Sequence, residues 1–406
     1  MARERIAALD LGTTRTVVLI GEIAEDGLRV LGKGASRSRG LRRGVVVNMD
    51  EAARSIGEAL RAAEADAGAR ENDVFVGFSG EHIESVNSSG AVAIGSEAGR
   101  GVTQEDVVRA RESATALKIP SDRQVIHVLT QDHIVDNQGG IHDPCGMSGV
   151  RLEVRVHIVT GAVTPLRNVR NCIVQSGMQV RELVLDTIAA GEAALTSDEK
   201  ELGVVLLDLG GGTTKVALYH QGSIRHSAVI PAGGNNLTND IAIGLRTPHE
   251  DAERIKRGYA SAVYVRPDRD NMIEVPGVGG REPRQVTREE LAFVVGPRIK
   301  ELLYLAREEI RGSGFEHLVG TGIVITGGGA LMPGIAKLAG QVFDMSAKIG
   351  GPQEFPGLEC DENAPMYATS AGLLRYAMNN QLEKEWLHGT EGGLLDRVIS
   401  RIAALM

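Results

Sequence analysis

Two aspartates in this sequence are each followed by a glycine-rich turn, an arrangement that can bind phosphate and a metal ion. Asp10 ends an apolar run and precedes Leu-Gly-Thr-Thr at 11–14, and Asp208 ends a second apolar run and precedes Leu-Gly-Gly-Gly-Thr-Thr at 209–214. Glycine allows positive φ and lets backbone N–H groups approach an anion without interference from Cβ. An aspartate at the end of a strand can hold Mg²⁺ through water. Each stretch therefore predicts a strand, a phosphate-binding turn and a second strand.

The two stretches, residues 6–18 and 204–217, are similar enough to indicate an internal duplication. One copy alone would favour an ordinary β-hairpin, whereas two matched copies favour two halves that clamp one polyphosphate from both sides. The residues expected to contact the nucleotide phosphates are Gly12, Thr13, Thr14, Arg15, Gly210, Gly211, Gly212, Thr213, Thr214 and Lys215. Asp10 and Asp208 are expected to hold Mg²⁺ through water and to serve any catalysis.

A third glycine-rich turn follows an apolar strand at residues 322–326, and a helix is expected to begin after it at Pro333. Together the three turns resemble the two phosphate motifs and the adenosine motif of the superfamily that contains actin, sugar kinases and heat-shock-chaperone ATPases. The resemblance implies an α/β, actin-like two-lobe fold with duplicated ribonuclease-H-like subdomains and ATP bound between the lobes. The residues it places against the adenosine are Gly327, Gly328, Gly329 and Met332.

The composition limits the class of protein. The chain has 406 residues, of which 42% are hydrophobic and 24% are charged, so it can form two or more globular domains. An aromatic content of 3% and a net charge of −9 argue against nucleic-acid binding. The three cysteines are far apart and predict reduced thiols rather than a zinc site. We expect no signal peptide and no membrane-spanning helix, so any membrane contact should be peripheral.

The first lobe is expected to comprise residues 1–84, 163–197 and about 360–380. It should contain an amphipathic helix from Asp50 to residue 67, with Asp50 as its N-cap. A strand at 179–185 should end directly before Asp186. Several members of the superfamily carry a carboxylate at this place, usually Glu, to position the attacking water. Because Asp is one methylene shorter, Asp186 predicts nucleotide binding with at most slow hydrolysis.

Residues 85–162 are expected to form a small α+β insertion, with a helix near 103–117 capped by Thr103. Several His and Asp residues lie in this segment, but their spacing matches no metal pattern, and we expect a solvated face.

This insertion carries a closer resemblance. The FtsA family of bacterial cell-division proteins is similar at residues 44–48, 79–83, 87–90, 126–129 and 143–153, and the resemblance extends over about 5–380. It implies self-association into actin-like filaments, capture of the C-terminal tail of the division protein FtsZ, and contacts with other division proteins. It also implies a peripheral position on the cytoplasmic side of the inner membrane at the division site.

The second lobe is expected to comprise residues 198–234 and 313–359, with a subdomain inserted at 235–312. Gly233, Gly234 and Asn235 form a turn into a helix, and the backbone amides there can help to hold phosphate.

Two sets of charged residues in the inserted subdomain are candidate contacts. Glu253, Lys256 and Arg257 share a helix face and resemble the superfamily's ribose and adenine clamp, although a solvated, salt-bridged surface gives the same pattern. The resemblance to FtsA places the FtsZ tail on this subdomain. Arg298 and Lys300, on a helix over 287–311, are available to an acidic tail, but any solvent-facing helix carries such charges.

The C-terminal segment predicts an amphipathic helix over 394–406, joined to the lobes by a linker at 381–393. At 100° per residue, the polar residues lie opposite an apolar face. That face consists of Leu394, Leu395, Val398, Ile399, Ile402, Leu405 and Met406. We expect it to lie in the headgroup region of anionic membrane lipids, and docking on its own lobe is the alternative.

Three classes of function fit the ATP motifs: a polymerising scaffold, a small-molecule kinase and a chaperone. A kinase would need a catalytic base besides Asp10 and Asp208, and a chaperone would need a substrate-binding domain for which we expect no room. The scaffold is therefore favoured. Its alternative is a pilus or secretion scaffold similar to the actin-fold protein PilM, whose relatives lack a terminal amphipathic helix.

Overall fold

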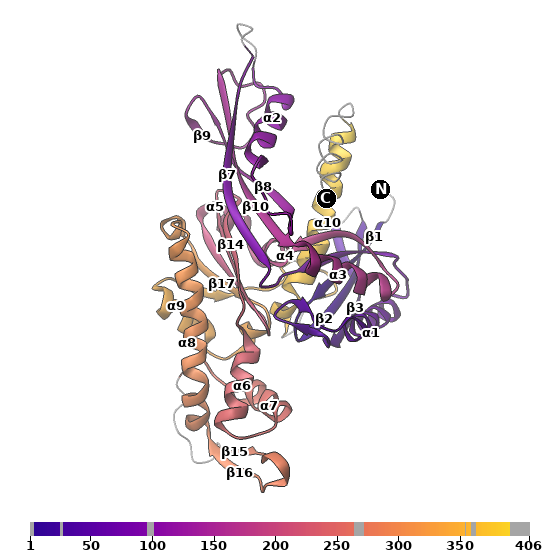
Figure 1. The fold of residues 1–406 in the computed structure, drawn as a ribbon, viewed down its shortest axis with the longest axis vertical. Helices are drawn as coiled ribbons and strands as arrows, with labels where there is room; N and C mark the ends of the chain where they lie inside the picture. Colours follow the sequence, from indigo (N-terminus) through magenta and orange to yellow (C-terminus); the bar gives the residue numbers. More distant parts are fainter. Residues whose placement is uncertain are drawn as a thin grey trace.

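The structure, a computed structural model, describes residues 4–24, 27–95, 101–263, 272–353, 355–358 and 363–389. Two lobes lie side by side at the middle of an elongated molecule (Figure 1). A subdomain built on a four-stranded sheet projects from one end, and a mainly helical subdomain with a small hairpin projects from the other.

Each lobe is built on a five-stranded sheet. The strands of the first sheet are β1 (Glu4–Leu11), β2 (Arg15–Ala24), β3 (Gly27–Arg37), β6 (Asp73–Phe78) and β11 (Gln179–Leu185). The strands of the second are β12 (Val204–Leu209), β13 (Thr214–His220), β14 (Ser223–Ile230), β17 (Gly322–Thr326) and β18 (Ala347–Ile349).

Both sheets have the same strand order, β3-β2-β1-β6-β11 in the first and β14-β13-β12-β17-β18 in the second. In each sheet the first three strands are antiparallel hairpins, and the last two are parallel to the first. The predicted duplication is therefore confirmed. In both copies the predicted phosphate-binding turn connects the first two strands.

The helices of the first lobe are α1 (Met49–Ala67), α3 (Val163–Gln175), α4 (Asp186–Ala194) and α10 (Ala368–Gly389). The short strands β4 (Leu41–Arg42) and β5 (Val45–Val46) precede α1, and α5 (Ser197–Leu202) leads into the second lobe. Helix α10 packs on β1, β2 and β6 and against α4. Its Leu373 and Leu374 are 0% exposed and belong to the first-lobe core. Gly372 allows the close approach of the two helices, because an added Cβ would lie 1.7 Å from the Ala189 carbonyl oxygen.

The start of α1 differs from the prediction. Its N-cap is Asn48, whose extended backbone directs the side-chain oxygen to accept from the backbone N–H of Glu51 at 3.2 Å. Asp50 lies instead in the first turn, where a negative charge is also favourable, and it accepts from the Gln175 side chain at 2.9 Å. Both residue types form N-caps, so local sequence did not distinguish them.

The insert consists of β7 (Ile83–Ala93), α2 (Gln104–Thr115), β8 (Arg123–Val135), β9 (Gln138–Ile141) and β10 (Arg151–Ala162). Its sheet has the order β7-β10-β8-β9, and α2 packs on β7 and β10. Thr103 caps α2 as predicted, in a reciprocal pair with Asp106. Several of its His and Asp side chains bond the insert's own backbone: His133 contacts the Ile141 carbonyl, and Asp132 accepts from the Gly140 N–H.

The subdomain of the second lobe consists of α6 (Gly234–Gly244), α7 (His249–Tyr259), β15 (Met272–Val275), β16 (Arg284–Thr287) and α8 (Arg288–Gly312). Thr287 caps α8, which extends from the hairpin along the second lobe (Figure 1). Helix α9 (Ile335–Phe343) begins two residues later than predicted, because Gly334 before it has a left-handed backbone with φ of 80°.

The described residues end at Gly389, within the predicted linker. Helix α10 continues to Gly389, so residues 381–389 of that linker are helical. The predicted amphipathic helix at 394–406 lies outside the described residues. Among the helices that are described, none combines the length and apolar character needed to cross a membrane.

Candidate functional site

A cleft between the lobes brings the two phosphate-binding turns together. Its lining includes Asp10, Gly12, Thr13, Thr14, Arg15, Asp186, Asp208, Gly210, Gly211, Gly212, Thr213, Lys215, Gly327 and Gly328. The turns touch: a Cβ added at Gly211 would lie 2.3 Å from Thr14 Cγ2, and one at Gly212 would lie 2.5 Å from Thr13 Oγ1. The two turns can approach each other this closely because both positions are glycine.

The cleft holds a cluster of three carboxylates and one ammonium group, in which Asp186, Asp208 and Lys215 are buried and Asp10 is partly buried. Lys215 Nζ lies 2.6 Å from Asp208 Oδ2 and 2.8 Å from Asp186 Oδ2. Asp186 and Asp10 come from the first lobe, whereas Asp208 and Lys215 come from the second. Lys215 was predicted as a phosphate contact, and in the structure it forms an ion bridge between the lobes.

Burial and mutual repulsion shift the pKa values of this cluster. Burial, with the charge of Asp186 adding to it, raises the pKa of Asp10 to about 8, against the opposing effect of Lys215. Burial also raises the pKa of Asp186. For Lys215, burial alone would lower the pKa, but the carboxylates of Asp186, Asp208 and Asp10 outweigh it and raise the pKa above its usual value. In the absence of metal, the Asp10 carboxyl is thus mostly protonated at neutral pH.

The cluster has the chemistry of a magnesium site completed by ligand and water. Carboxylate oxygens are the ligands that Mg²⁺ prefers. Asp186 Oδ1 is buried and has no hydrogen-bond partner within the described ranges, as expected for a group that binds water or a metal-bound water. In the described part of the chain, no three His, Cys, Asp or Glu side chains are grouped closely enough to hold a metal by themselves. The predicted mode, Mg²⁺ held through water, is compatible with this geometry.

Arg15 connects the first turn to the start of α10. Its Nη2 donates to the Tyr367 hydroxyl at 2.8 Å, and its guanidinium lies 4.9 Å from the centre of the Tyr367 ring. Thr13 Oγ1 accepts from the backbone N–H of Gly44 at 3.1 Å. The first turn is therefore held by contacts with two distant parts of the sequence, Gly44 and Tyr367.

The residues at the N-terminus of α6 lie behind the second turn rather than in the cleft. The Gly234 N–H donates to the Gly210 carbonyl at 2.9 Å, and the Asn235 N–H donates to the Gly211 carbonyl at 2.7 Å. These amides were predicted to hold phosphate. In the structure they hold the backbone of the turn, and the neighbouring Gly233 does not line the cleft either.

The predicted ribose and adenine clamp is a closed network in this structure. Lys256 Nζ lies 2.6 Å from Glu253 Oε2, which also accepts from the Thr238 hydroxyl at 2.6 Å. Burial opposes ionisation of Glu253, but Lys256 outweighs it and lowers the pKa. Arg257 is exposed, and none of Glu253, Lys256 and Arg257 lines the cleft.

The third turn contributes two of its four predicted residues to the cleft. Gly327 has φ of 80°, and a Cβ there would lie 2.2 Å from Asp208 Oδ1, so glycine is required. At Gly328 an added Cβ would lie 3.9 Å from Met366 Cε and would meet no other described atom within 4 Å. Gly329 and Met332 do not line the cleft, and Met332 packs against the second-lobe core.

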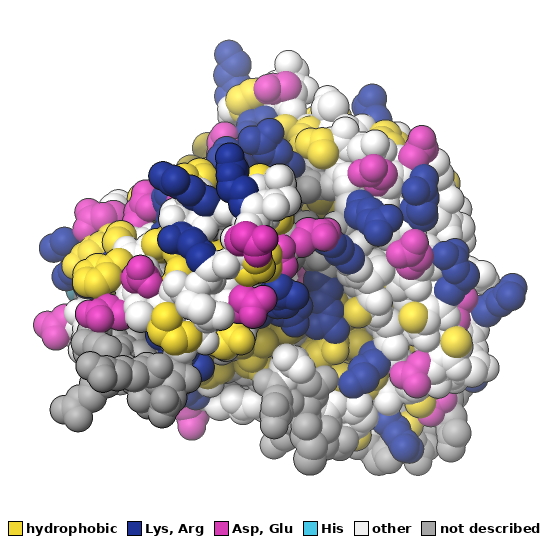
Figure 2. All heavy atoms as spheres, turned by 90° about the horizontal axis from the view of Figure 1, so that it is seen from below, with side chains coloured by type: hydrophobic (Ala, Val, Ile, Leu, Met, Phe, Trp, Pro, Cys, Tyr) yellow, Lys and Arg dark blue, Asp and Glu magenta, His cyan; other side chains and the backbone are white. Residues whose placement is uncertain are grey.

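The predicted partner residues lie on α8, away from the cleft. Arg298 is bound to Asp240 at 2.6 Å and also to Glu301, and these contacts raise its pKa. Lys300 is exposed. The same subdomain exposes two hydrophobic side chains that were not predicted as contacts, Phe293 at 73% and Ile243 at 77% exposed. Seen from this end, the surface carries hydrophobic side chains beside Lys and Arg (Figure 2).

The sequence matches two family profiles, one described as Cell division protein FtsA over residues 205–372 and one described as an SHS2 domain inserted in FTSA over residues 80–160. The Cell division protein FtsA of Pseudomonas aeruginosa is 46% identical over 377 residues, which cover 93% of this chain and 90% of the relative. That of Neisseria meningitidis is 44% identical, with coverage of 92% and 90%. That of Bacillus subtilis is 38% identical, with coverage of 93% and 84%.

Solved structures of other proteins have a similar fold. A PilM-PilN type IV pilus biogenesis complex matches with a TM-score of 0.67 at 16% identity, covering 91% of this chain and 98% of that chain. MreB5 of Spiroplasma citri bound to ADP matches with a TM-score of 0.57 at 16% identity, covering 94% and 98%. At such identity the likeness concerns the fold alone. The predicted actin-like two-lobe fold with an inserted subdomain is confirmed.

Proposed function

Because this chain belongs to the FtsA family of cell-division proteins, we propose that it is an ATP-binding, self-associating scaffold that tethers FtsZ filaments to the inner face of the cytoplasmic membrane at the division septum. ATP binding is inferred chiefly from the pair of duplicated turns, which contact each other and line one cleft with the carboxylates of Asp10 and Asp208. The ADP bound to the fold relative MreB5 supports the same inference.

In this proposal different residues bind the phosphates, the adenosine and the metal ion of the nucleotide. The backbones of the two turns and the hydroxyls of Thr13 and Thr213 bind phosphate, and Gly328 lies against adenosine. Asp10 and Asp208 hold the water shell of Mg²⁺, which neutralises phosphate charge when bound. Asp186 orients water, and its short side chain predicts at most slow hydrolysis. Glu253, Lys256 and Arg257 reach the ribose and base only if their network opens.

Gly328→Val is expected to weaken Mg-ATP binding about tenfold, because the branched side chain would occupy open space in the cleft. Titration with a fluorescent ATP analogue in Mg²⁺ measures the affinity. Gly258→Val is the matched control, since an added Cβ at Gly258 on α7 meets no atom of the described residues within 4 Å and Gly258 does not line the cleft. Saturable binding that survives Asp208→Ala combined with Gly328→Val would refute the proposed nucleotide site.

Tethering FtsZ filaments to the membrane requires two further surfaces, one for lipid and one for FtsZ. We place the membrane contact on the apolar face of residues 394–406, whose two arginines would add about 1 kcal/mol each of attraction to anionic lipid. A single short helix binds weakly, so firm attachment should need many subunits side by side in a filament. We place the FtsZ tail on the subdomain that carries α8. Exposed Phe293 and Ile243 offer apolar contact there, and Lys300 offers a cation, whereas Arg298 is already balanced by Asp240 and Glu301.

One sedimentation assay with anionic phospholipid vesicles and FtsZ tests both surfaces. The full chain should carry FtsZ into the pellet, while a 1–392 truncation and Val398→Glu should remain with FtsZ in the supernatant. Ser400→Gln, on the polar face, is the matched control and should behave as wild type. Lys300→Glu should pellet but leave more FtsZ behind. If the full chain, the truncation and Val398→Glu pellet equally, the membrane surface is wrongly placed.

A pilus or secretion scaffold similar to PilM is the alternative function. The likeness to PilM-PilN is one of fold at 16% identity, whereas the sequence relatives at up to 46% identity are cell-division proteins. Cell division is therefore the favoured function, and failure of the full chain to capture FtsZ on vesicles would favour the alternative.

A further inference from the structure

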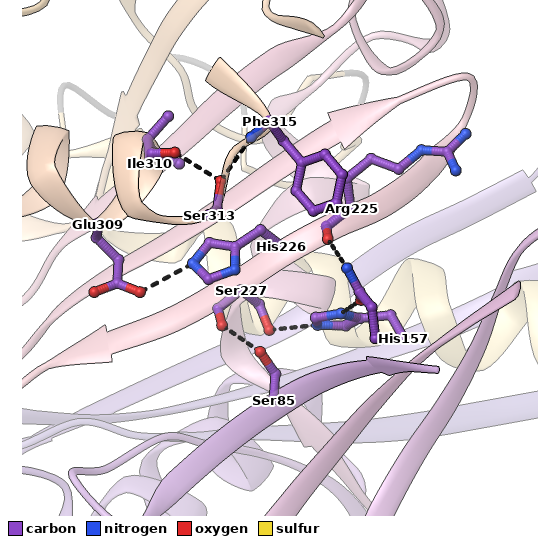
Figure 3. Close-up of polar contacts among 10 residues, drawn as sticks. Ser85, His157, Arg225, His226, Ser227, Glu309, Ile310, Ser313 and Phe315 are labelled. Carbon is purple, nitrogen blue, oxygen red and sulfur yellow. Dashed lines mark hydrogen bonds and ion pairs between the residues drawn. The ribbon is translucent and has the colours of Figure 1, made fainter. Parts of the chain in front are cut away.

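The insert is joined by the chain to the first lobe, yet it is also attached to the second lobe along β14 (Figure 3). Among the described strands, β14 has a neighbour on one side only. Insert side chains cover its other edge: Asn87 Nδ2 donates to the Arg225 carbonyl at 2.9 Å, and the Ser85 hydroxyl donates to the Ser227 carbonyl at 2.7 Å. The buried His157 ring bonds Asn87 Oδ1 at 2.7 Å and Ser227 Oγ at 2.8 Å. These contacts hold the insert against the second lobe.

From this position the insert also reaches the wall of the nucleotide cleft. The buried His127 of β8 accepts a hydrogen bond at Nε2 from the backbone N–H of Leu185, at 3.1 Å. Burial lowers the pKa of His127 to about 4, so the imidazole is neutral at physiological pH and Nε2 can accept. Leu185 is the last residue of β11 and directly precedes Asp186.

Asp186 lines the cleft, and only one of its two carboxylate oxygens has a partner among the described residues. Its Oδ2 binds Lys215, whereas its buried Oδ1 has no hydrogen-bond partner among the described residues. A Cβ added at Gly77 would lie 2.8 Å from Oδ1, so the absence of a side chain at Gly77 leaves this oxygen room. Asp186 projects from the backbone that follows Leu185, and the hydrogen bond from Leu185 to His127 is the contact by which the insert holds that backbone.

We propose that His127 is a positioning residue of the nucleotide site, which sets the direction of Asp186 toward the water shell of bound Mg-ATP. The inference rests on the proposed nucleotide binding. It makes the insert a functional part of the cleft, because the same subdomain is bonded to β14 and to the residue before Asp186. By linkage, Mg-ATP that binds more tightly when the insert is docked must stabilise the docked insert to the same degree.

The test compares Mg-dependent affinities for a fluorescent ATP analogue among variants of the full chain. His127→Phe keeps an apolar ring but removes the acceptor, and it should weaken binding about five- to tenfold. His127→Gln restores an acceptor near the place of Nε2 and should recover most of the affinity. His133→Phe is the matched control, because His133 lies on the same strand, is 9% exposed and, among the described residues, hydrogen-bonds the insert's own Ile141 carbonyl at 3.1 Å.

A double-mutant cycle separates positioning from general damage to the fold. In an Asp186→Asn background, His127→Phe should have little further effect, because the group that it positions has lost its charge. The inference is overturned if His127→Phe binds as wild type, if His133→Phe weakens binding equally, or if the loss persists undiminished in the Asp186→Asn background. A wild-type chain that does not bind the analogue refutes the proposed function instead, and the same titration shows this first.

Discussion

Replacing Lys215 with methionine is expected to lower the free energy of unfolding by about 3–5 kcal/mol, because the buried carboxylates of Asp186 and Asp208 lose the cation that bridges them. The ammonium lies 2.6 Å from Asp208 and 2.8 Å from Asp186. Urea unfolding at mildly alkaline pH, followed by circular dichroism, measures the loss. Lys348→Met is the matched control. The Lys348 ammonium lies 2.7 Å from Glu199, but its side chain is 50% exposed, so the loss should be about 0–1 kcal/mol.

The deficit of Lys215→Met should shrink as the pH falls. Burial already raises the pKa of Asp186, and removal of the neighbouring cation would raise that pKa further. Between the ordinary and the raised pKa, the native state binds more protons than the unfolded state, so its stability increases toward lower pH. Adding Asp186→Asn to Lys215→Met should restore part of the stability at alkaline pH. A loss no larger than that of Lys348→Met would contradict the role given to the ion bridge.

Asp10→Asn is expected to weaken Mg-ATP binding about 10- to 100-fold and to remove most of its pH dependence. Because burial and Asp186 raise the pKa of Asp10 to about 8, the metal-free carboxyl is mostly protonated at neutral pH. Mg²⁺ favours the ionised form, so binding should release a proton. The affinity of the wild type should therefore increase by up to about tenfold per pH unit as the pH approaches the pKa of Asp10, and then level off.

Calorimetric titration in two buffers with different ionisation heats counts the protons released. Asp198→Asn is the matched control, because Asp198 is exposed on α5 and should leave both affinity and proton release unchanged. The metal-free protein offers a second readout. Between pH 3.8 and about 8 native Asp10 binds a proton that the unfolded chain has lost, so the wild type loses stability as the pH increases and Asp10→Asn loses less. Equal proton release by wild type and Asp10→Asn would rule Asp10 out as its source.

The turns and their strands could be predicted because their signals are local. In each copy an apolar run, an aspartate and glycines follow one another directly, and the strand from Gln179 to Leu185 has the bounds that the sequence predicted. The contact between Asp208 and Lys215 could also have been predicted from the sequence. Asp208 and Lys215 are opposite each other in the register of the predicted hairpin, so cross-strand pairing alone indicates that they meet.

The rest of the site depends on contacts between residues that are distant in sequence. Nothing near Lys215 in the chain indicates that Asp186 approaches it from the other lobe. A helical pattern shows which charges share a face but not whether they are already paired, as Arg298 is with Asp240. The hydrogen bond from Leu185 to His127 likewise joins two segments whose sequences carry no sign of each other. These features follow from tertiary packing, which local pattern does not determine.

The place of α10 in the sequence also bears on how the chain folds during its synthesis. The ribosome makes β1, β2 and β6 long before it makes Leu373 and Leu374, which are fully buried against the first-lobe core. The described strands of the second sheet are also made before α10, so the first lobe lacks this helix until the second sheet has been synthesised. Throughout that interval one apolar face of the first sheet lacks its cover. A nascent chain in that state presents the kind of surface that chaperones bind, and its escape from aggregation depends on how quickly translation reaches α10.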